Sequence, residues 1–320
     1  MPNLLLTGST GFVGRAVLRR FADLGWTVMG IGRRPNDSPS YLSHDLRHPL
    51  PASMDFKPDA VVHAAALSSP WGSRRAFREH NVTATQHVID YCRRNGCPRF
   101  VYISSSSVYY QACDQFDLSE SMPVAQHPIN RYAASKIEAE KVVATYEGEH
   151  VILRPRAVFG PDDTVLFPRI LRAARAGRLP LLYRDGEAAV GDLIYIDNLV
   201  DYIATVVTNR DVKGTFNLTN NEPVPIAAFL LSVFEQLGVR PPRKRVNVKT
   251  AMRLARVLEM FHGVFLPWIE PPITRFGVHV FAYSKTFDVR RAVEILGAPQ
   301  VSNAEGAKRF VDWVKREQPY

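Results

Sequence analysis

The chain has 320 residues, which is enough for a large hydrophobic core and for one or two domains. Hydrophobic residues make up 46% and charged residues 22%, a composition that excludes a disordered or fibrous protein. The net charge of +9 comes from basic residues scattered in pairs, not from one long basic run. Solvated helix faces explain most of these pairs. Attraction of an anionic small molecule and, more weakly, nucleic-acid binding are the alternatives, and we expect no nucleic-acid partner.

The expected location is the cytoplasm. No apolar run reaches the length of about 18 residues that a membrane span requires. Residues 1–8 lack the basic segment and the long apolar run of a secretory signal. The three cysteines (Cys92, Cys97 and Cys113) have no metal-like spacing, so we expect free thiols in a reducing compartment and no metal site.

The first half of the chain alternates short apolar runs with longer amphipathic segments. The apolar runs predict strands at 3–7, 27–31, 60–63 and 100–104. The segments with a helical period predict helices at 11–24, 74–94 and 130–146. Strands that alternate with helices are typical of βαβ units, so the sequence predicts an α/β fold with a doubly wound parallel sheet.

The rhythm changes after residue 153. Prolines interrupt the pattern, and the later elements are a predicted strand at 192–196 and a helix at 198–208. We therefore expect a first domain over residues 1–160, with segments near 190–210 returning to it, and a smaller lobe over 161–320. The sequence shows no internal repeat.

A glycine-rich segment, TGSTGFVG at residues 7–14, follows the first predicted strand and opens the first helix. Its three glycines allow a tight turn and a close approach to a pyrophosphate, and the helix N-terminus offers free N–H groups. The context predicts dinucleotide binding. The expected contacts are Gly8, Thr10, Gly11, Phe12, Val13 and Gly14.

The end of the second strand predicts the cofactor. Gly32 stands where an NAD-selective fold usually has an acidic residue, and Arg33 and Arg34 follow it. Guanidinium groups suit a 2′-phosphate, so we expect NADP(H), with Arg33 as the main contact and Arg34 beside it. NAD remains possible if the two arginines are a solvated surface pair.

Two further motifs carry chemistry. Tyr132 and Lys136 are four residues apart and so share one helix face, where a lysine cation and an oxidised nicotinamide would lower the pKa of the phenol. Serines 104–107 follow a strand at its carboxyl end, where ligands bind in open α/β sheets. One of these hydroxyl groups can hold a substrate oxygen beside the tyrosine.

Five motifs in the same order resemble the extended short-chain dehydrogenase/reductase superfamily: TGSTGFVG at 7–14, HAAA at 63–66, SSSSVY at 104–109, YAASK at 132–136 and LRPRAVFGP at 153–161. The resemblance implies a Rossmann-type sheet with a smaller C-terminal α/β substrate lobe. It also implies that Ser105 is the catalytic serine, that Tyr132 is the acid/base and that Lys136 is its partner.

The same resemblance implies further contacts to the cofactor. These are Asp45 and Leu46 at the adenine, His63, Ala64 and Ala65 along the ribose and pyrophosphate, and the backbone from Pro155 to Val158 at the carboxamide. Asn81 matches a position near the active site of family members, although a buried asparagine bonded to backbone groups explains it equally well. Tyr110 stands where the family usually has glycine.

Three positions that differ from the superfamily's motifs indicate which branch of the superfamily the chain resembles. Ser106 and Ser107 follow Ser105 where dehydratases carry acids, and Gly191 replaces the arginine that nucleotide-sugar enzymes use for a phosphate. Segments 191–197, 216–223 and 270–275 look more like the 3β-hydroxysteroid dehydrogenase-like branch. The expected activity is NADP-dependent hydride transfer between nicotinamide and a secondary alcohol or ketone, on a sterol-like or lipid-like substrate. A nucleotide-sugar epimerase and a non-catalytic NADP sensor are the rival interpretations.

Two expectations concern surfaces. The apolar segment 252–269 favours core packing, with an apolar pocket or peripheral membrane contact as the alternatives. By analogy with the superfamily, helices at 74–94 and 130–146 predict a homodimer interface.

Overall fold

The computed structural model of the chain describes residues 1–184 and 188–317. Its centre is a seven-stranded sheet in the order β12-β7-β5-β4-β1-β2-β3, in which every neighbouring pair is parallel. The strands are β1 (Asn3–Thr7), β2 (Thr27–Gly32), β3 (Tyr41–Ser43), β4 (Ala60–His63), β5 (Arg99–Ile103), β7 (His150–Pro155) and β12 (Gly214–Leu218). The chain winds outward from β1 in both directions, which confirms the doubly wound α/β prediction.

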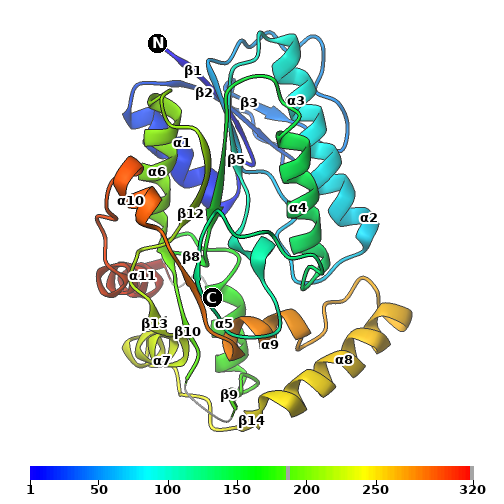
Figure 1. Cartoon of the computed structure of the whole chain (residues 1–320), viewed down its shortest axis with the longest axis vertical. Coiled ribbons are helices and arrows are strands. Elements are labelled where there is room, and N and C mark those ends of the chain that lie inside the picture. The colour runs from blue at the N-terminus through cyan, green and yellow to red at the C-terminus, as the bar shows by residue number, and fades with distance from the viewer. Residues whose placement is uncertain (185–187, 318–320) are drawn as a thin grey trace.

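Helices cover both faces of this sheet (Figure 1). One layer holds α1 (Phe12–Asp23) and α6 (Ile196–Thr208), and the other holds α3 (Ala84–Arg94) and α4 (Arg131–Val143). Strand side chains alternate between the layers: Leu4 and Leu6 pack with the α1 side, whereas Leu5 packs with the α3 side. This burial on both faces explains why the strands are continuous apolar runs.

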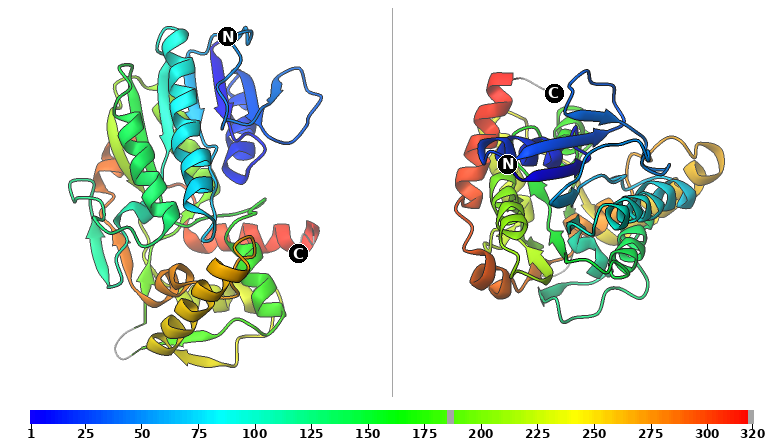
Figure 2. Two further views of the ribbon diagram at one scale, coloured as in Figure 1. Left: turned by 90° about the vertical axis from the view of Figure 1, so that its right-hand side faces the viewer. Right: turned by 90° about the horizontal axis from the view of Figure 1, so that it is seen from above.

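Most of the remaining elements lie in the lower half of the molecule in Figure 1, and Figure 2 shows them from two further sides. A second sheet has the order β13-β10-β15-β6, and two-stranded pairs join β11 to β8 and β14 to β9. The strands are β6 (Gln115–Leu118), β8 (Val158–Phe159), β9 (Leu181–Tyr183), β10 (Val190–Gly191), β11 (Ile194–Tyr195), β13 (Val224–Pro225), β14 (Arg245–Asn247) and β15 (Lys285–Phe287). The helices are α2 (Arg74–Phe77), α5 (Phe167–Arg175), α7 (Ile226–Gln236), α8 (Val248–Phe265), α9 (Arg275–Ala282), α10 (Arg290–Leu296) and α11 (Asn303–Glu317).

Two predicted elements differ from the structure. The helix expected at 74–94 is divided into α2, a π-helical turn at Arg78–Thr83 and α3. The strand expected at 192–196 is shorter than predicted: only β11 (Ile194–Tyr195) forms, and α6 already begins at Ile196. Asp192 lies between β10 and β11, and its carboxylate accepts a hydrogen bond from the Phe287 N–H (2.9 Å). Asp192 thus ties this segment across to β15 instead of continuing a strand.

The domain boundary near residue 160 and the homodimer stay predictions. The structure does return later segments to the first half, because β12 extends the central sheet and α6 packs beside α1. Among the described residues, no helix combines the length and the apolar character needed to cross a membrane.

Candidate active site

The turn between β1 and α1 requires glycine at two positions. Gly8 has φ +72°, and a Cβ there would lie 2.8 Å from the backbone N and Cα of Ala65. A Cβ on Gly14 would lie 2.0 Å from the Gly8 carbonyl oxygen. Gly11 caps α1 without any side-chain hydrogen bond, so the first N–H groups of the helix are not taken by a capping side chain. This cradle suits a pyrophosphate.

Two other residues expected at the loop, Phe12 and Val13, have side chains that pack into the core. Phe12 is buried in the core, and Val13 packs against it. Their side chains therefore fasten α1 to the sheet. The Thr10 carbonyl accepts a hydrogen bond from the Arg15 guanidinium (3.1 Å).

His63 lies at the end of β4 and is buried. Its Nδ1 is 2.6 Å from the Thr7 hydroxyl, and its Nε2 is 3.0 Å from the Thr85 hydroxyl. Burial, together with the nearby Lys136 charge, lowers the pKa of His63 to about 3, so the ring is neutral at neutral pH. The side chain joins β1, β4 and α3, while the backbone of Ala64 and Ala65 runs against Gly8.

Basic groups gather at the ends of β2 and β3. Arg33 and Arg34 are exposed, and neither guanidinium has an ion pair within the described ranges. Their charges reach their neighbours: Arg33 helps burial to lower the pKa of His80, and Arg34 acts on Tyr41, whose hydroxyl donates to the Arg34 carbonyl (2.7 Å). Gly32 lies under this group, because a Cβ there would be 2.6 Å from the Tyr41 hydroxyl oxygen.

The predicted adenine segment follows β3. The Asp45 carboxylate accepts hydrogen bonds from Nε (2.9 Å) and Nη2 (2.8 Å) of Arg47, which hold its pKa down at about 2. Leu46 is buried, and its carbonyl is 2.9 Å from Nδ1 of His87. The Asp45 carboxylate therefore already has a partner, and Arg47 is a charged neighbour that sequence reasoning missed.

The structure brings Ser105 and Tyr132 together. Ser105 begins the 3₁₀ turn after β5, and its Oγ accepts from the Ser107 N–H (3.2 Å). Tyr132 is half-buried at the start of α4. Burial raises the pKa of its phenol, and hydrogen bonds with the Ser105 and Ser68 hydroxyl groups act in the opposite direction. Ser68 is a second hydroxyl partner of the phenol that the sequence did not indicate.

Lys136 is held differently from the expectation. Its Nζ donates to the Ile103 carbonyl (2.7 Å) and to the Tyr102 hydroxyl (3.3 Å), and it lies 4.7 Å from the Tyr102 ring centroid. Burial lowers its pKa to about 7, which the Glu140 charge partly opposes. Burial raises the pKa of the Tyr132 phenol, and its electrostatic neighbour here is Tyr110 instead of Lys136. The lowering of this pKa by Lys136 together with an oxidised nicotinamide stays a prediction.

Asn81 lies in the π-helical turn and is fully engaged. Its Nδ2 donates to the Ser135 hydroxyl (2.8 Å) and the Leu67 carbonyl (3.3 Å), and its Oδ1 accepts from the Leu67 N–H (2.7 Å). Ser135 in turn donates to the Tyr132 carbonyl (2.7 Å). Asn81 therefore fixes the start of α4 relative to the loop after β4, which favours the structural interpretation of this residue.

A buried polar cluster beside the phenol was missed. Tyr110 is 3% exposed, its hydroxyl lies 3.0 Å from the Ser106 Oγ, and the Arg156 guanidinium lies 5.4 Å from its ring centroid. Lys285 Nζ lies 5.8 Å from the same centroid and donates to the carbonyl groups of Cys113 and Ser284. Burial lowers the pKa of Lys285 to about 8.

A buried arginine, Arg156, lies beside Gly191. The Arg156 side chain is 3% exposed and its Nε has no hydrogen-bond partner among the described residues. Its Nη2 lies 3.3 Å from the place of a Cβ on Gly191. A guanidinium therefore does stand beside position 191, supplied by the segment between β7 and β8. Arg156 is the second arginine of the LRPRAVFGP motif at 153–161, for which the sequence predicted only backbone contacts to the cofactor.

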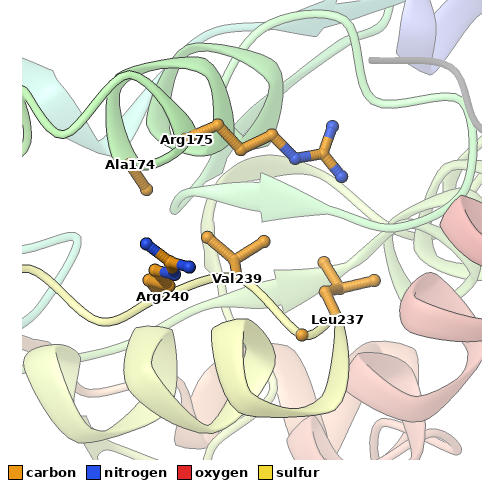
Figure 3. Close-up of a pocket in the computed structure, with 6 residues that line it drawn as sticks. Ala174, Arg175, Leu237, Val239 and Arg240 are labelled. Atoms are coloured by element: carbon orange, nitrogen blue, oxygen red, sulfur yellow. The ribbon is translucent and has the colours of Figure 1, made fainter.

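A separate depression of about 400 Å³ lies in the C-terminal lobe (Figure 3). It is lined by Ala174, Arg175, Leu237, Gly238, Val239 and Arg240. None of the predicted site residues lines it, and it offers neither a phenol nor a serine hydroxyl. We therefore place the candidate active site at the carboxyl ends of the central strands instead.

A parallel sheet with a glycine cradle at the end of β1, and with a serine and tyrosine pair at the end of β5, defines an oxidoreductase of the nicotinamide-dependent Rossmann class. Residues 4–219 match the model of the NAD dependent epimerase/dehydratase family. The chain belongs to this family, within the extended short-chain dehydrogenase/reductase superfamily.

Individual relatives agree with this assignment. The chain is 31% identical to 2-alkyl-3-oxoalkanoate reductase from Shewanella oneidensis, covering 97% of this chain and 86% of that protein. It is 26% identical to mouse (Mus musculus) sterol-4-alpha-carboxylate 3-dehydrogenase, decarboxylating, over 95% and 88% of the two chains. The structure of MoeE5 in complex with UDP-glucose and NAD has a TM-score of 0.76 at 22% identity and covers 99% of both chains, which supports the fold.

Proposed function

We propose that this oxidoreductase uses NADP(H) to interconvert a secondary alcohol and a ketone on a lipid-like acid. The observation that carries the proposal is the Tyr132 phenol beside the Ser105 hydroxyl at the carboxyl edge of the sheet, close enough for that hydroxyl to oppose the rise that burial causes in the phenol's pKa. When bound, the nicotinamide supplies or accepts the hydride. Tyr132 donates or removes the proton at the substrate oxygen, and Ser105 positions that oxygen.

Lys136 of α4 lies against the end of β5, next to this site. Its ammonium is held by the Ile103 carbonyl at the end of β5, on the strand that leads to Ser105. A pKa of about 7 lets it exist in both protonation states near neutral pH, which suits a group that exchanges a proton with its surroundings. We assign it to positioning and to proton exchange, together with Tyr132.

Gly8, Gly11 and Gly14 would hold the pyrophosphate, and Arg33 and Arg34 the 2′-phosphate. The two guanidinium groups support NADP(H) over NAD because no ion pair within the described ranges neutralises them. Asp45 follows the adjoining strand β3, and Arg47 compensates its charge.

The acid class of the substrate rests on Arg156. The buried Asp192 carboxylate lies near enough to feel the Arg156 charge, but the Arg156 Nε still has no hydrogen-bond partner among the described residues, and a substrate carboxylate could fill that place. Tyr110 links this guanidinium to the Tyr132 phenol. Both the reductase of Shewanella oneidensis and the mouse sterol enzyme are named for carboxylate-bearing compounds, which supports the assignment.

A turnover panel tests the proposal. It contains a 2-alkyl-3-oxo acid, the methyl ester of that acid, a sterol alcohol and a UDP-sugar, each with NADP(H). We expect net change of nicotinamide absorbance with the acid, and about tenfold or more lower kcat/KM with the ester, the scale of one charge-assisted hydrogen bond. Arg156→Leu should abolish that preference. Conversion of the UDP-sugar to its epimer without net absorbance change would establish the rival epimerase instead.

A cofactor titration tests the arginines separately. Arg33→Ser should weaken NADPH binding by about tenfold or more, the scale of one charge-assisted phosphate contact, and leave NADH binding nearly unchanged. Arg240→Ser, an exposed arginine of the C-terminal lobe, is the control and should alter neither affinity. Fluorescence titration of both reduced cofactors measures the effect. Equal affinities of the unmodified protein for NADH and NADPH would contradict the NADP assignment.

A further inference from the structure

The expectation that segment 252–269 packs into the core is wrong for most of its large side chains. Eight of the sixteen exposed large hydrophobic residues in the described part of the chain lie here, with exposed fractions between 45% and 77%. They are Leu254, Val257, Met260, Phe261, Val264 and Phe265 of α8, followed by Trp268 and Ile269. We call these eight residues the α8 apolar surface.

The opposite face of α8 is firmly held. Val248, Ala251 and Ala255 are buried against Val278 and Ala282 of α9. Residues three and four apart share a helix face, so burial of one face fixes which side chains point outward. Figure 1 shows α8 at the outer edge of the C-terminal lobe, with α9 on its inner side. The exposure of the apolar surface is therefore set by the packing of the helix.

Further contacts fix the C-terminal end of the helix. The Glu259 carboxylate accepts a hydrogen bond from the Arg275 Nε (2.6 Å), and His262 Nδ1 lies 2.9 Å from the Ile269 carbonyl. These contacts hold the turn that carries Trp268, which is the most exposed member of the α8 apolar surface. The turn and the helix thus present one continuous face.

The charges around this surface are almost all positive. Between residues 240 and 258 the chain has no acidic residue. The exposed basic residues of that stretch are Arg240, Arg243, Lys244, Arg245, Lys249, Arg253 and Arg256. The two acids that follow, Glu259 and Glu270, are paired with Arg275 and Arg169. The helix therefore combines a basic N-terminal half with an apolar C-terminal half.

The apolar surface adjoins the active site. The Trp71 indole N–H donates to the Pro267 carbonyl (3.1 Å), and its ring lies 6.5 Å from His262, edge to face. Trp71 is held to Ser69 by two hydrogen bonds, and Ser68, the preceding residue, contacts the Tyr132 phenol. One short loop thus links the end of α8 to the phenol.

We propose that the α8 apolar surface lies in the headgroup region of an anionic lipid bilayer. Side chains such as Phe265 and Trp268 enter the acyl boundary, while Arg253 and Arg256 contact lipid phosphates. A second copy of the chain fits this pattern less well. An antiparallel pair of α8 helices sets the basic half of each against the apolar half of the other, and a parallel pair sets cations against cations.

The α8 apolar surface lies beside the loop that carries Ser68, so membrane contact would bring the bilayer close to the active site. A lipid-like substrate can pass from the bilayer to the phenol without crossing water. This route rests on the proposed function, whereas the membrane contact does not.

Vesicle co-sedimentation of the full chain tests the proposal. The vesicles contain either equal parts of phosphatidylglycerol and phosphatidylcholine, or phosphatidylcholine alone. We expect binding mainly to the anionic vesicles, and a loss of about tenfold or more in the double variant Phe265→Ser/Trp268→Ser. Phe116→Ser is the matched control, because Phe116 is 57% exposed in β6, and it should bind like the unmodified protein. Arg253→Gln/Arg256→Gln should lose the preference for anionic lipid.

Trp268 gives a second readout. Its emission should shift to shorter wavelength on anionic vesicles, and Trp268→Phe should remove most of that shift while retaining binding. Equal binding of the unmodified protein and the Phe265→Ser/Trp268→Ser variant would overturn the proposal. A dimer in size-exclusion chromatography that this variant dissociates, without any vesicle binding, would assign the surface to a second copy. If the turnover panel fails but vesicle binding holds, only the proposed function falls.

Discussion

Replacing Tyr132 by phenylalanine should lower turnover by at least about a hundredfold, the usual scale of acid/base catalysis by one side chain. The Ser105 and Ser68 hydroxyl groups both act on the pKa of this phenol, so its oxygen is the point where a substrate oxygen would exchange a proton. The ring itself is retained, and the cofactor cradle around Gly8 is untouched. Binding of NADP(H) should therefore stay within about twofold of the unmodified protein.

Single-turnover absorbance and cofactor titration measure these two quantities separately. Tyr202→Phe is the matched control: Tyr202 is a buried phenol in α6, away from the serines, and its loss should leave turnover unchanged. Ser68→Ala should cost less than Tyr132→Phe because Ser105 still holds the phenol. If Tyr132→Phe keeps most of the activity while Tyr202→Phe behaves as expected, the proton-transfer role does not belong to Tyr132.

Local sequence rules predicted that the serines at 104–107 and Tyr132 lie at one edge of the sheet, whereas the choice of Ser105 among these serines came from the resemblance to the superfamily. The carboxyl end of a buried parallel strand and the first turn of the following helix meet at one edge of the sheet, so the apolar run before the serines predicts the location of both. Such rules could not predict where the Lys136 ammonium points. Spacing puts it on the same helix face as Tyr132, but the Ile103 carbonyl and the Tyr102 ring, from a strand more than thirty residues earlier, decide where the ammonium lies.

The argument from Gly191 was incomplete for a related reason. A missing arginine at one position says nothing about a guanidinium from another segment, and here Arg156, between β7 and β8, lies beside Gly191. The error in segment 252–269 is also one of context. An amphipathic pattern predicts one buried face, but only the packing of α8 on α9 reveals that small residues such as Ala251 and Ala255 form that face. The large apolar residues then lie outside.

Gly14→Ala should weaken cofactor binding by about five- to a hundredfold and should also destabilise the fold. The new Cβ would lie 2.0 Å from the Gly8 carbonyl oxygen and 2.8 Å from the Ser9 Cα. Both are backbone atoms, so no side-chain rotation relieves the contact and the turn itself must move. Overpacking of this kind costs about 1–3 kcal/mol, and each 1.4 kcal/mol corresponds to about tenfold in affinity.

Gly263→Ala supplies the control because it makes the same substitution inside a helix where a Cβ meets nothing within 4 Å. Alanine is favoured over glycine in a helix by about 1 kcal/mol, so this variant should be as stable as the unmodified protein or more so. Thermal unfolding with and without NADP(H) separates the two effects. The cofactor should raise the Tm of Gly263→Ala as it does that of the unmodified protein, and raise that of Gly14→Ala far less. An equal rise in all three would mean that the turn at Gly8 is not where the pyrophosphate binds.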